Sequence, residues 1–276
     1  MTVVGQEHEV AVIAENGVSV ESVGFGSFTA RPAAVAELTA SVDWLLVTTK
    51  APALSAALGR VRAAPAMIVP LLNGLEHVAV LRSLFPNSQV VAGTIRMEAD
   101  CPAAGHVVHS SPSVRVELAS DDPIAQGRLG DLAQLLRQAG VPTEIGVSEA
   151  QVLWSKLARL NALASTTSAA DASIGQIRDD PEWRATLIAC VEETVAAATA
   201  DGAAIDSRVS IAELDAAHPA QGSSMRRDLA AGREPELDAI LGAVLRAAAR
   251  HGLEAPTVAR LAAAIAERAD VPAPHV

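Results

Sequence analysis

The sequence predicts an α/β domain followed by an all-helical domain, and three observations support this fold class. Before Gly146, short apolar runs alternate with segments of helical periodicity. After Gly146 the strand patterns stop, and segments rich in alanine and leucine follow one another at helical spacing. The chain has 276 residues, which corresponds to roughly two domains of ~150 residues. We therefore predict one domain over residues 1–146 and a second over residues 147–276.

The N-terminal domain is expected to contain a parallel sheet. Residues 43–49 and 66–72 are compact apolar runs, and a helical segment, residues 53–63, lies between them. A strand, a helix and a strand in this order, with both strands apolar throughout, imply a right-handed crossover and a sheet covered on both faces. Further strands are predicted at residues 18–23, 27–31, 89–97, 105–110 and 113–118.

The C-terminal domain is expected to be entirely helical. Its predicted helices span residues 148–170, 181–200, 208–217, 224–231, 235–250 and 255–268. Prolines and glycines fall where these helices begin or end. Ser224 is predicted as the N-cap of its helix, and Pro235 as the first residue of the next one, which places Glu236 at a positive helix end.

The composition excludes several classes of function. The chain has 21 basic and 32 acidic residues, and a net charge of −11 excludes binding of nucleic acid as a main function. Its two cysteines, Cys101 and Cys190, lie far apart in the sequence and suggest neither a disulfide framework nor a thiolate metal site. No apolar stretch reaches the ~20 residues of a membrane span, and residues 1–9 do not resemble a signal peptide. We therefore expect a soluble, cytoplasmic protein with no metal and no nucleic-acid or membrane partner.

Lysine usage indicates two candidate functional residues. Among the 21 basic residues, only Lys50 and Lys156 are lysines. Burial can shift the pKa of a lysine, whereas arginine stays charged, so a lysine kept in an arginine-rich chain is a candidate for function. Lys156 lies in an apolar helical run, and burial there would lower its pKa. The alternative is a lysine that extends from a helix edge into solvent.

Lys50 and Asn73 both follow predicted strands. Lys50 comes directly after residues 43–49, and Asn73 comes directly after residues 66–72. Ligands of open parallel sheets bind outside the carboxyl ends of the strands, so a cation and an amide at these positions are candidates for ligand binding. A solvated lysine and a turn asparagine with local hydrogen bonds are the alternatives.

Together, several blocks of sequence resemble the ketopantoate reductase (2-dehydropantoate 2-reductase) family. Their order and spacing are similar over residues 2–268. The blocks are Val47-Thr48-Thr49-Lys50-Ala51, Leu72-Asn73-Gly74-Leu75, Trp154-Ser155-Lys156-Leu157, Ser223-Ser224-Met225-Arg226-Arg227-Asp228 with Glu236, and Arg250-His251-Gly252 with Pro256. The resemblance implies an incomplete Rossmann-type parallel-sheet domain followed by a helical domain. It also implies the reduction of 2-dehydropantoate to pantoate with NADPH, a step towards pantothenate.

The resemblance also assigns roles to five residues. It implies that Lys156 is the general acid that protonates the carbonyl oxygen, and that Glu236 hydrogen-bonds the hydroxyl end of the substrate. It places Ser224 and Asn73 at the substrate, Asn73 also at the nicotinamide, and Lys50 near the cofactor. Because hydride transfer creates an alkoxide, the chemistry requires a proton donor beside the reacting carbon.

The front of the chain departs from the family pattern. No Gly-x-Gly-x-x-Gly loop precedes Lys50, and residues 2–5 resemble the second strand of the family. We therefore expect that ~25–30 residues of strand, loop and helix are missing from the front of this chain. No arginine follows Val4 as a partner for a 2′-phosphate. NADPH is thus implied by the resemblance alone, and NAD is not excluded.

A second departure lies on the helix of Lys156. The family commonly has asparagine four and eight residues after the lysine, and here those positions are Leu160 and Ala164. Asn161 is five residues from Lys156, which turns it about 140° away around a regular helix. We expect a substrate pocket less polar than that of the family, which opens the possibility of a 2-oxo acid other than 2-dehydropantoate as the natural substrate.

These departures leave three hypotheses open. The first is a reductase of the ketopantoate reductase type. The second is a truncated, non-catalytic homologue that acts as a helical dimerisation or small-molecule-binding module. The third is a related NAD-linked dehydrogenase for a different small 2-oxo or 2-hydroxy acid. A homodimer is left open in each case.

Overall fold

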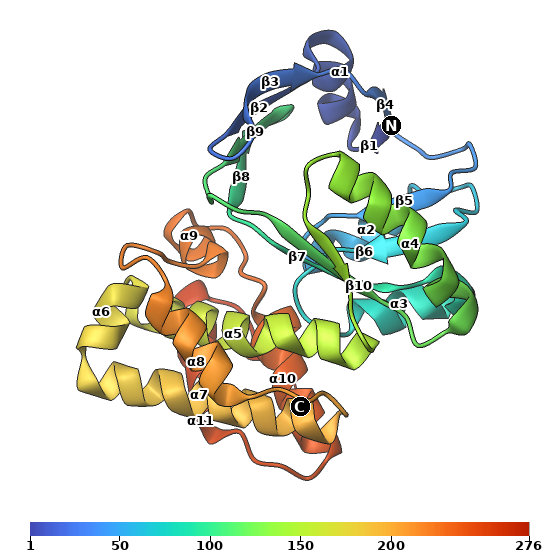
Figure 1. The fold of residues 1–276 in the computed structure, drawn as a ribbon. Coiled ribbons are helices and arrows are strands. Elements are labelled where there is room, and N and C mark those ends of the chain that lie inside the picture. Colours follow the sequence, from blue (N-terminus) through green and yellow to red (C-terminus); the bar gives the residue numbers. More distant parts are fainter. Residues whose placement is uncertain (276) are drawn as a thin grey trace. The chain divides into compact units, whose positions relative to one another are not determined.

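The computed structural model describes residues 1–275, and these form two compact units (Figure 1). Unit 1 comprises Met1–Leu72 and Leu81–Gly146. Unit 2 comprises Asn73–Val80 and the chain from Val147 onward. The sequence places residues 73–80 in the N-terminal domain, whereas in the structure this 73–80 segment packs with the helices of unit 2.

The first part of unit 1 contains two small sheets. Strand β1 (Thr2–Val4) pairs in parallel with β4 (Ala33–Val35), and α1 (Glu7–Asn16) packs on β4. The other sheet has the strand order β3–β2–β9–β8. Its strands are β2 (Val18–Ser22), β3 (Gly26–Ala30), β8 (Ala99–Ala103) and β9 (His106–His109).

The predicted strand–helix–strand unit is confirmed. Strands β5 (Trp44–Val47) and β6 (Met67–Pro70) are parallel neighbours, with Trp44 opposite Met67. The connection contains η1 (Ala51–Ala53) and α2 (Leu54–Leu58), which ends earlier than predicted, just before Gly59. Every residue of β6 is buried, as expected for a strand covered on both faces.

The rest of unit 1 is a three-stranded sheet with a long helix. The strand order is β11–β10–β7, with β10 (Arg115–Ala119) parallel to β11 (Thr143–Ile145) and antiparallel to β7 (Ala92–Arg96). Helix α4 (Pro123–Gln138) packs on β10 and β11. Helix α3 (His77–Leu84), followed by η2 (Asn87–Gln89), begins in the 73–80 segment and ends in unit 1.

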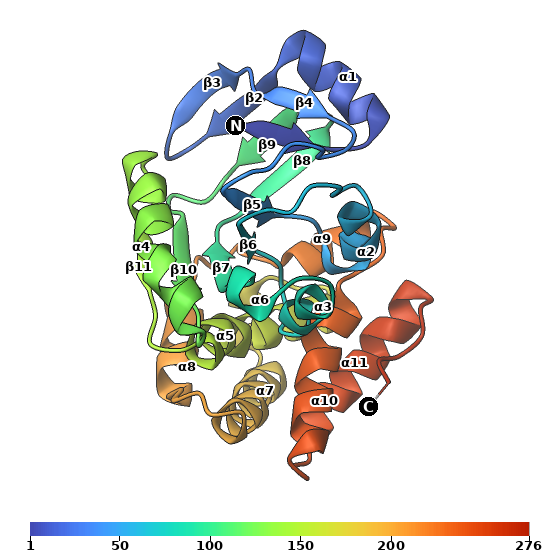
Figure 2. The ribbon, with the colours of Figure 1, turned by 90° about the vertical axis from the view of Figure 1, so that its right-hand side faces the viewer.

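The strands of unit 1 do not form one continuous sheet. Among the described strands, the parallel pairs β1–β4 and β5–β6 belong to separate sheets. Figure 2 shows the first pair set apart from the second. Each pair therefore has edge groups outside a continuous ladder, although Ile68 of β6 forms an isolated bridge with Val90. The predicted Rossmann-type sheet is present as parallel pairs rather than as a single sheet.

Unit 2 is all-helical, as predicted, and is built around α5 (Glu149–Ala170). Helix α5 contacts α6, α7, α8, α9, α11 and the π-helical segment η3. The bounds are α6 (Ile174–Asp179), α7 (Pro181–Ala200), α8 (Ser207–Ala216), α9 (Ser224–Ala230), η3 (Asp238–Gly242), α10 (Ala243–Arg250) and α11 (Pro256–Ala269).

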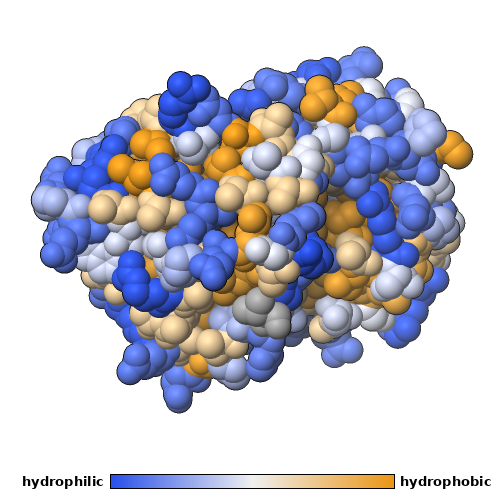
Figure 3. All heavy atoms as spheres, turned by 90° about the horizontal axis from the view of Figure 1, so that it is seen from below, coloured by the Kyte–Doolittle hydropathy of each residue, from blue (hydrophilic) through white to orange (hydrophobic). Residues whose placement is uncertain are grey.

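The core of unit 2 consists mainly of alanine, leucine, valine and isoleucine around one large aromatic side chain, Trp154, which is 2% exposed. The face drawn in Figure 3 is mostly polar, with smaller apolar areas between the polar residues. Among the residues that the structure describes, no helix combines the length and the apolar character needed to cross a membrane.

Two helix starts differ from the prediction. Helix α9 begins at Ser224, but its N-cap is Ser223, whose hydroxyl accepts a hydrogen bond from the Arg226 N–H at 3.1 Å. Ser224 is therefore the first helical residue and not the cap. The next helix begins at Leu237 rather than at Pro235, because Glu236 precedes the helix and its carbonyl accepts the N–H of Ile240.

Candidate active site

Asn73 and Glu236 meet in unit 2 although 163 positions separate them in the sequence. The Asn73 side-chain amide donates a hydrogen bond of 2.8 Å to Oε2 of Glu236. Glu236 is 6% exposed, so the amide donates to a carboxylate that is largely shielded from solvent. A buried carboxylate needs hydrogen-bond donors, and Asn73 provides one of them. Two predicted site residues are thus brought into direct contact.

Gly74 allows the close approach of the 73–80 segment to η3. Its φ of +87° lies in the left-handed region, and a Cβ added here would lie 2.1 Å from the carbonyl oxygen of Ala239. Ala239 belongs to η3, a π-helical turn that begins two residues after Glu236. Only glycine fits both the backbone conformation and the available space. Short π-helical turns frequently occur at functional sites.

Glu76 and Arg246 fasten the same segment by an ion pair with two hydrogen bonds. Arg246 Nε donates to Glu76 Oε1 at 2.8 Å, and its Nη2 donates to Oε2 at 2.6 Å. Arg246 Nη1 also donates to the Asp238 carboxylate of η3 at 2.7 Å. Hydrogen bonds from Arg246 to Glu76, the largest cause, and to Asp238 raise the pKa of this guanidinium despite its partial burial. The fork of an arginine thus joins the 73–80 segment to η3.

Lys156 lies on α5 in the same unit and interacts electrostatically with His77 of the 73–80 segment. His77 is 5% exposed, and its pKa is lowered to about 4 by burial first and by the Lys156 charge second. The imidazole is therefore neutral at physiological pH. Lys156 itself is half-buried, and its neighbour Leu157 packs into the core. The structure thus places a lysine and a neutral histidine near each other.

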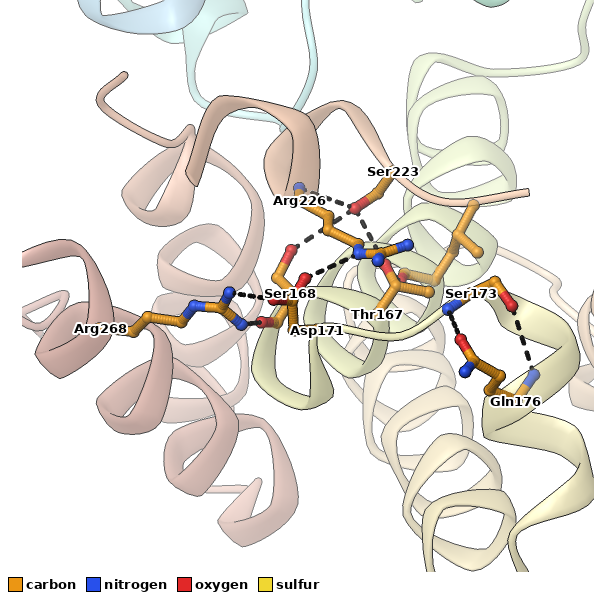
Figure 4. A network of polar contacts seen from close by, with 9 residues as sticks. Thr167, Ser168, Asp171, Ser173, Gln176, Ser223, Arg226 and Arg268 are labelled. Carbon is orange, nitrogen blue, oxygen red and sulfur yellow. Dashed lines mark hydrogen bonds and ion pairs between the residues drawn. The ribbon is translucent and has the colours of Figure 1, made fainter. Parts of the chain in front are cut away.

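Ser224 is held on α9 by its neighbour Ser223. The Ser223 hydroxyl is 2.9 Å from the hydroxyl of Thr167 and 3.4 Å from that of Ser168, both on α5 (Figure 4). Ser223 is 4% exposed, whereas Ser224 is half-buried and its hydroxyl makes no hydrogen bond within the described chain. The first serine of the motif is therefore structural, and the second presents an available hydroxyl. The structure does not join Ser224 by a hydrogen bond to Asn73, Lys156 or Glu236.

A pocket lies beside this serine pair. Its volume is about 340 Å³, and its lining includes Asp171, Ser223, Arg226 and Arg227. Asp171 receives hydrogen bonds from Arg226 at 3.0 Å and from Arg268 at 2.6 Å, which lower the pKa of its carboxyl group (Figure 4). The carboxylate therefore ties α9 and α11 to the end of α5.

Two blocks that carry the sequence resemblance have a structural role here. Trp154 Nε1 donates to Asp201 Oδ2 at 3.2 Å, Arg250 donates to the same oxygen at 3.2 Å, and His251 Nε2 lies 2.6 Å from Oδ1. One carboxylate therefore ties the end of α7 to α5 and to the end of α10. Trp154, Arg250 and His251 hold helices together around the site.

Asn161 faces away from Lys156, as the helical spacing predicts. Its amide donates to Thr194 Oγ1 of α7 at 2.8 Å and contacts Cys190 Sγ at 3.5 Å. Asn161 is fully buried, and Ala164 is 1% exposed. Leu160, four residues after Lys156, is half-buried. The face of α5 that carries Lys156 therefore lacks an asparagine amide.

Lys50 belongs to unit 1 and is exposed directly before η1. It lies just beyond the carboxyl end of β5. The hydroxyl oxygen of its neighbour Thr49 is buried and has no hydrogen-bond partner. Lys50 and Thr49 thus present a cation and an unsatisfied hydroxyl at the strand end where ligands of parallel sheets bind.

Comparison with known proteins identifies the family. The family model described as "Ketopantoate reductase PanE/ApbA" matches residues 1–122, and the one described as "Ketopantoate reductase PanE/ApbA C terminal" matches residues 150–269. A 2-dehydropantoate 2-reductase of Caulobacter vibrioides is 31% identical over 246 residues, which cover 86% of this chain and 81% of the relative. The chain belongs to the ketopantoate reductase family. This family consists of oxidoreductases.

Other similar proteins agree with this family assignment. A 2-dehydropantoate 2-reductase of Halobacterium salinarum is 28% identical over 274 residues, which cover 95% of this chain and 88% of the relative. The solved 2-dehydropantoate 2-reductase of Geobacter metallireducens matches with a TM-score of 0.88 at 25% identity over 96% of this chain and 91% of that chain. A D-mandelate dehydrogenase solved with NADH and anilino(oxo)acetate has the same fold, with a TM-score of 0.88 at 20% identity over 98% of this chain and 90% of that chain.

In this member of the ketopantoate reductase family, sequence reasoning missed three residues near the predicted site. They are Glu76, His77 and Arg246, which the structure places around Asn73 and Lys156. Glu76 and His77 follow the Asn73-Gly74 block in the sequence, and this proximity was the available signal. Nothing in the sequence pairs Glu76 with Arg246, which lies 170 positions away.

Proposed function

We propose that this chain catalyses the reduction of 2-dehydropantoate, or of a similar small 2-oxo acid, to the 2-hydroxy acid with NADPH. The observation that carries the proposal is the hydrogen bond between Asn73 and Glu236 in the unit that also contains Lys156. The names of relatives such as those of Caulobacter vibrioides and Halobacterium salinarum support the substrate class. A place in pantothenate biosynthesis, a cytoplasmic location and a homodimer stay predictions.

In the proposed reaction, the protein residues bind the oxo acid and supply a proton. Lys156 donates the proton to the carbonyl oxygen as negative charge develops there. Glu236, held by the Asn73 amide, accepts a hydrogen bond from the hydroxyl end of the substrate. Ser224 contributes the hydroxyl at the start of α9. Because the Asn73 amide already donates to Glu236, its carbonyl oxygen stays available to the substrate or the nicotinamide.

A pyridine nucleotide supplies the hydride when it is bound. The residues after β5 fit one end of such a cofactor, since Lys50 is an exposed cation and the hydroxyl of Thr49 is a buried group in need of a partner. No Gly-x-Gly-x-x-Gly loop occurs before Lys50 in the 276 residues. The proposal of NADPH rather than NADH rests on the family, and NADH is the alternative.

A second substrate is favoured by the face of α5. Leu160 and Ala164 lie four and eight residues after Lys156, where the ketopantoate reductase family commonly has asparagine. Apolar side chains there cannot hydrogen-bond a polar substrate. We therefore include a 2-oxo acid with an apolar side chain as the alternative substrate for the same reaction.

The test is a kinetic assay of the purified chain with a panel of 2-oxo acids. The panel contains 2-dehydropantoate, pyruvate, 3-methyl-2-oxobutanoate and phenylglyoxylate, each with NADPH and with NADH. We expect 2-dehydropantoate or a branched or aromatic 2-oxo acid to be reduced. Absence of turnover with every acid, together with no thermal shift and no quenching of tryptophan fluorescence by either cofactor, would instead support a non-catalytic helical module.

A first prediction concerns Lys156. Removing its ammonium in Lys156→Ala should lower kcat by about two powers of ten, because proton donation contributes roughly 10²–10⁴ to such a rate. Arg159→Ala is the matched control, since Arg159 lies on the same helix, is also a cation and forms an ion pair with Glu213 at 3.6 Å. The control should keep its turnover. Equal kcat values for wild type and Lys156→Ala would remove the lysine from the mechanism.

A further inference from the structure

His77 is a buried histidine without a hydrogen-bond partner for either ring nitrogen. It begins α3 within the 73–80 segment and is 5% exposed. Both Nδ1 and Nε2 are buried, and neither has a partner at hydrogen-bonding geometry among the described residues. The backbone of Asn73 interacts with the ring and acts to raise its pKa, but it lies outside hydrogen-bonding geometry. Most buried polar groups in proteins are hydrogen-bonded, so an imidazole with two unsatisfied nitrogens needs an explanation.

The surroundings of His77 fix its position. Asn73 is held by Glu236, Gly74 rests against η3, and Glu76 is bound by Arg246. These three contacts involve residues that precede His77 by one to four positions. They hold the start of α3 against the helices of unit 2. The imidazole is thus a rigidly supported group rather than a mobile surface side chain.

The charges around His77 are also defined. Lys156 on α5 is the charged group that acts on the ring, and it disfavours a second positive charge there. Glu76 is engaged by Arg246, and Glu236 accepts a hydrogen bond from Asn73. A neutral imidazole carries one N–H donor and one acceptor nitrogen. Both can serve a ligand without adding charge beside Lys156.

We propose that His77 is a substrate-binding residue, whose neutral imidazole forms a hydrogen bond with the 2-oxo acid beside Lys156. This inference rests on the proposed function. The bound acid supplies an acceptor oxygen for the ring N–H, which has no partner at hydrogen-bonding geometry in the free protein. The free energy lost by burying an unsatisfied ring is recovered when the ligand binds. The N–H of the imidazole donates to an oxygen of the acid, and proton transfer is the role of Lys156.

The proposal predicts opposite effects on stability and on binding. His77→Leu replaces the ring by an apolar side chain of similar size, which removes two unsatisfied buried groups. Its urea midpoint should equal or exceed that of the wild type. The same variant should bind 2-dehydropantoate about tenfold more weakly in calorimetry without cofactor, and its KM should rise by a similar factor. His77→Gln, which keeps a donor and an acceptor, should stay within about threefold of the wild type.

Val78→Ala is the matched control for simple loosening of the segment. Val78 is the next residue, is 6% exposed and carries no hydrogen-bonding group. The control should be less stable than the wild type yet bind the acid more tightly than His77→Leu. A His77→Leu variant that is destabilised like Val78→Ala and keeps wild-type affinity would show that the ring is structural and overturn the proposal.

The panel assay separates this inference from the proposed function. If the wild type neither binds nor reduces any 2-oxo acid, the proposed function fails and the role of His77 fails with it. If the wild type reduces an acid and His77→Leu has an unchanged KM and affinity for that acid, only the role of His77 is overturned.

Discussion

Asn73 and His77 are polar residues four positions apart, at the two ends of the turn that leads into α3, and their polar groups differ in hydrogen bonding. The Asn73 amide is satisfied by Glu236, whereas the ring nitrogens of His77 lack partners. Burial and the Lys156 charge both act against protonation of His77 and lower its pKa from 6.5 to about 4. His77 therefore stays neutral between pH 6.5 and about 4, a range in which an ordinary histidine is mostly protonated.

This lowered pKa predicts a pH dependence of stability. Between pH 6.5 and about 4 the unfolded chain binds a proton at His77 that the folded chain does not bind. Stability from this group is thus complete above pH 6.5 and is lost as the pH falls towards 4. From pH 7 to pH 5 the loss should be about 1–2 kcal/mol, given a pKa of about 4 in the folded chain.

Urea unfolding of wild type and His77→Gln at pH 7 and pH 5 measures this effect. Other groups titrate in both proteins, so the relevant quantity is the difference between the two pH dependences. The variant should lose less stability than the wild type on acidification. Parallel losses in the two proteins would show that His77 is protonated as readily in the folded state as in the unfolded one.

At the level of residues, the sequence could indicate candidate site residues but not the contacts between them. Lys156 stands out as one of two lysines, and Asn73 follows an apolar strand. The pairing of Asn73 with Glu236 joins two positions far apart in the chain, and local patterns carry no information about such a contact. The same holds for His77, because a single histidine beside a hydrophobic run has no distinctive spacing.

Among the elements, the 73–80 segment and η3 depend on each other. The segment lies in sequence between β6 and the body of α3, yet it packs with unit 2. The segment approaches η3 closely at Gly74, where the backbone has a positive φ and the carbonyl of Ala239 occupies the space of a side chain. Any side chain at residue 74 would push the segment away from η3.

Gly74→Ala should therefore destabilise the protein by about 3 kcal/mol or more. About 1 kcal/mol comes from the left-handed backbone and about 2 from the clash with Ala239. Gly232→Ala is the matched control, because Gly232 also has a positive φ, of 64°, but a Cβ there would meet nothing within 4 Å. Gly232→Ala should lower the free energy of unfolding only by the contribution of the left-handed backbone, about 1 kcal/mol. Urea unfolding that gives both variants the same stability would show that the segment can move aside.

The accuracy of the predicted elements depended on local signals. Helix α7 has the predicted bounds, because Asp180 caps it and Pro181 is its first residue. The sequence predicts neither α1 nor α4, whose buried residues are few, and it does not predict the short strands β4, β8 and β11. The helix after Pro235 starts late, because η3 begins with a wide π-helical turn that no sequence pattern marks.

For the whole molecule, the two units are stabilised in different ways. In unit 2, α5 is surrounded by other helices, and the backbone hydrogen bonds lie within each helix. In unit 1, the parallel pairs β1–β4 and β5–β6 belong to separate sheets, and β6 is linked beyond β5 by an isolated bridge between Ile68 and Val90. Short sheets with unpaired edges open more easily than a packed helical core, so local opening should be more frequent in unit 1.

Limited proteolysis tests this difference. Cleavage should begin in unit 1, around the edges of β1, β4 and β5, and leave a resistant fragment that starts near Gly146 and contains α5 to α11. The 73–80 segment should also be protected, because Arg246 and η3 hold it on unit 2. Mass spectrometry of the early fragments locates the first cuts. First cuts within α5 or α7, or equal resistance of both units, would contradict the inference that the discontinuous sheet is the weak part of the molecule.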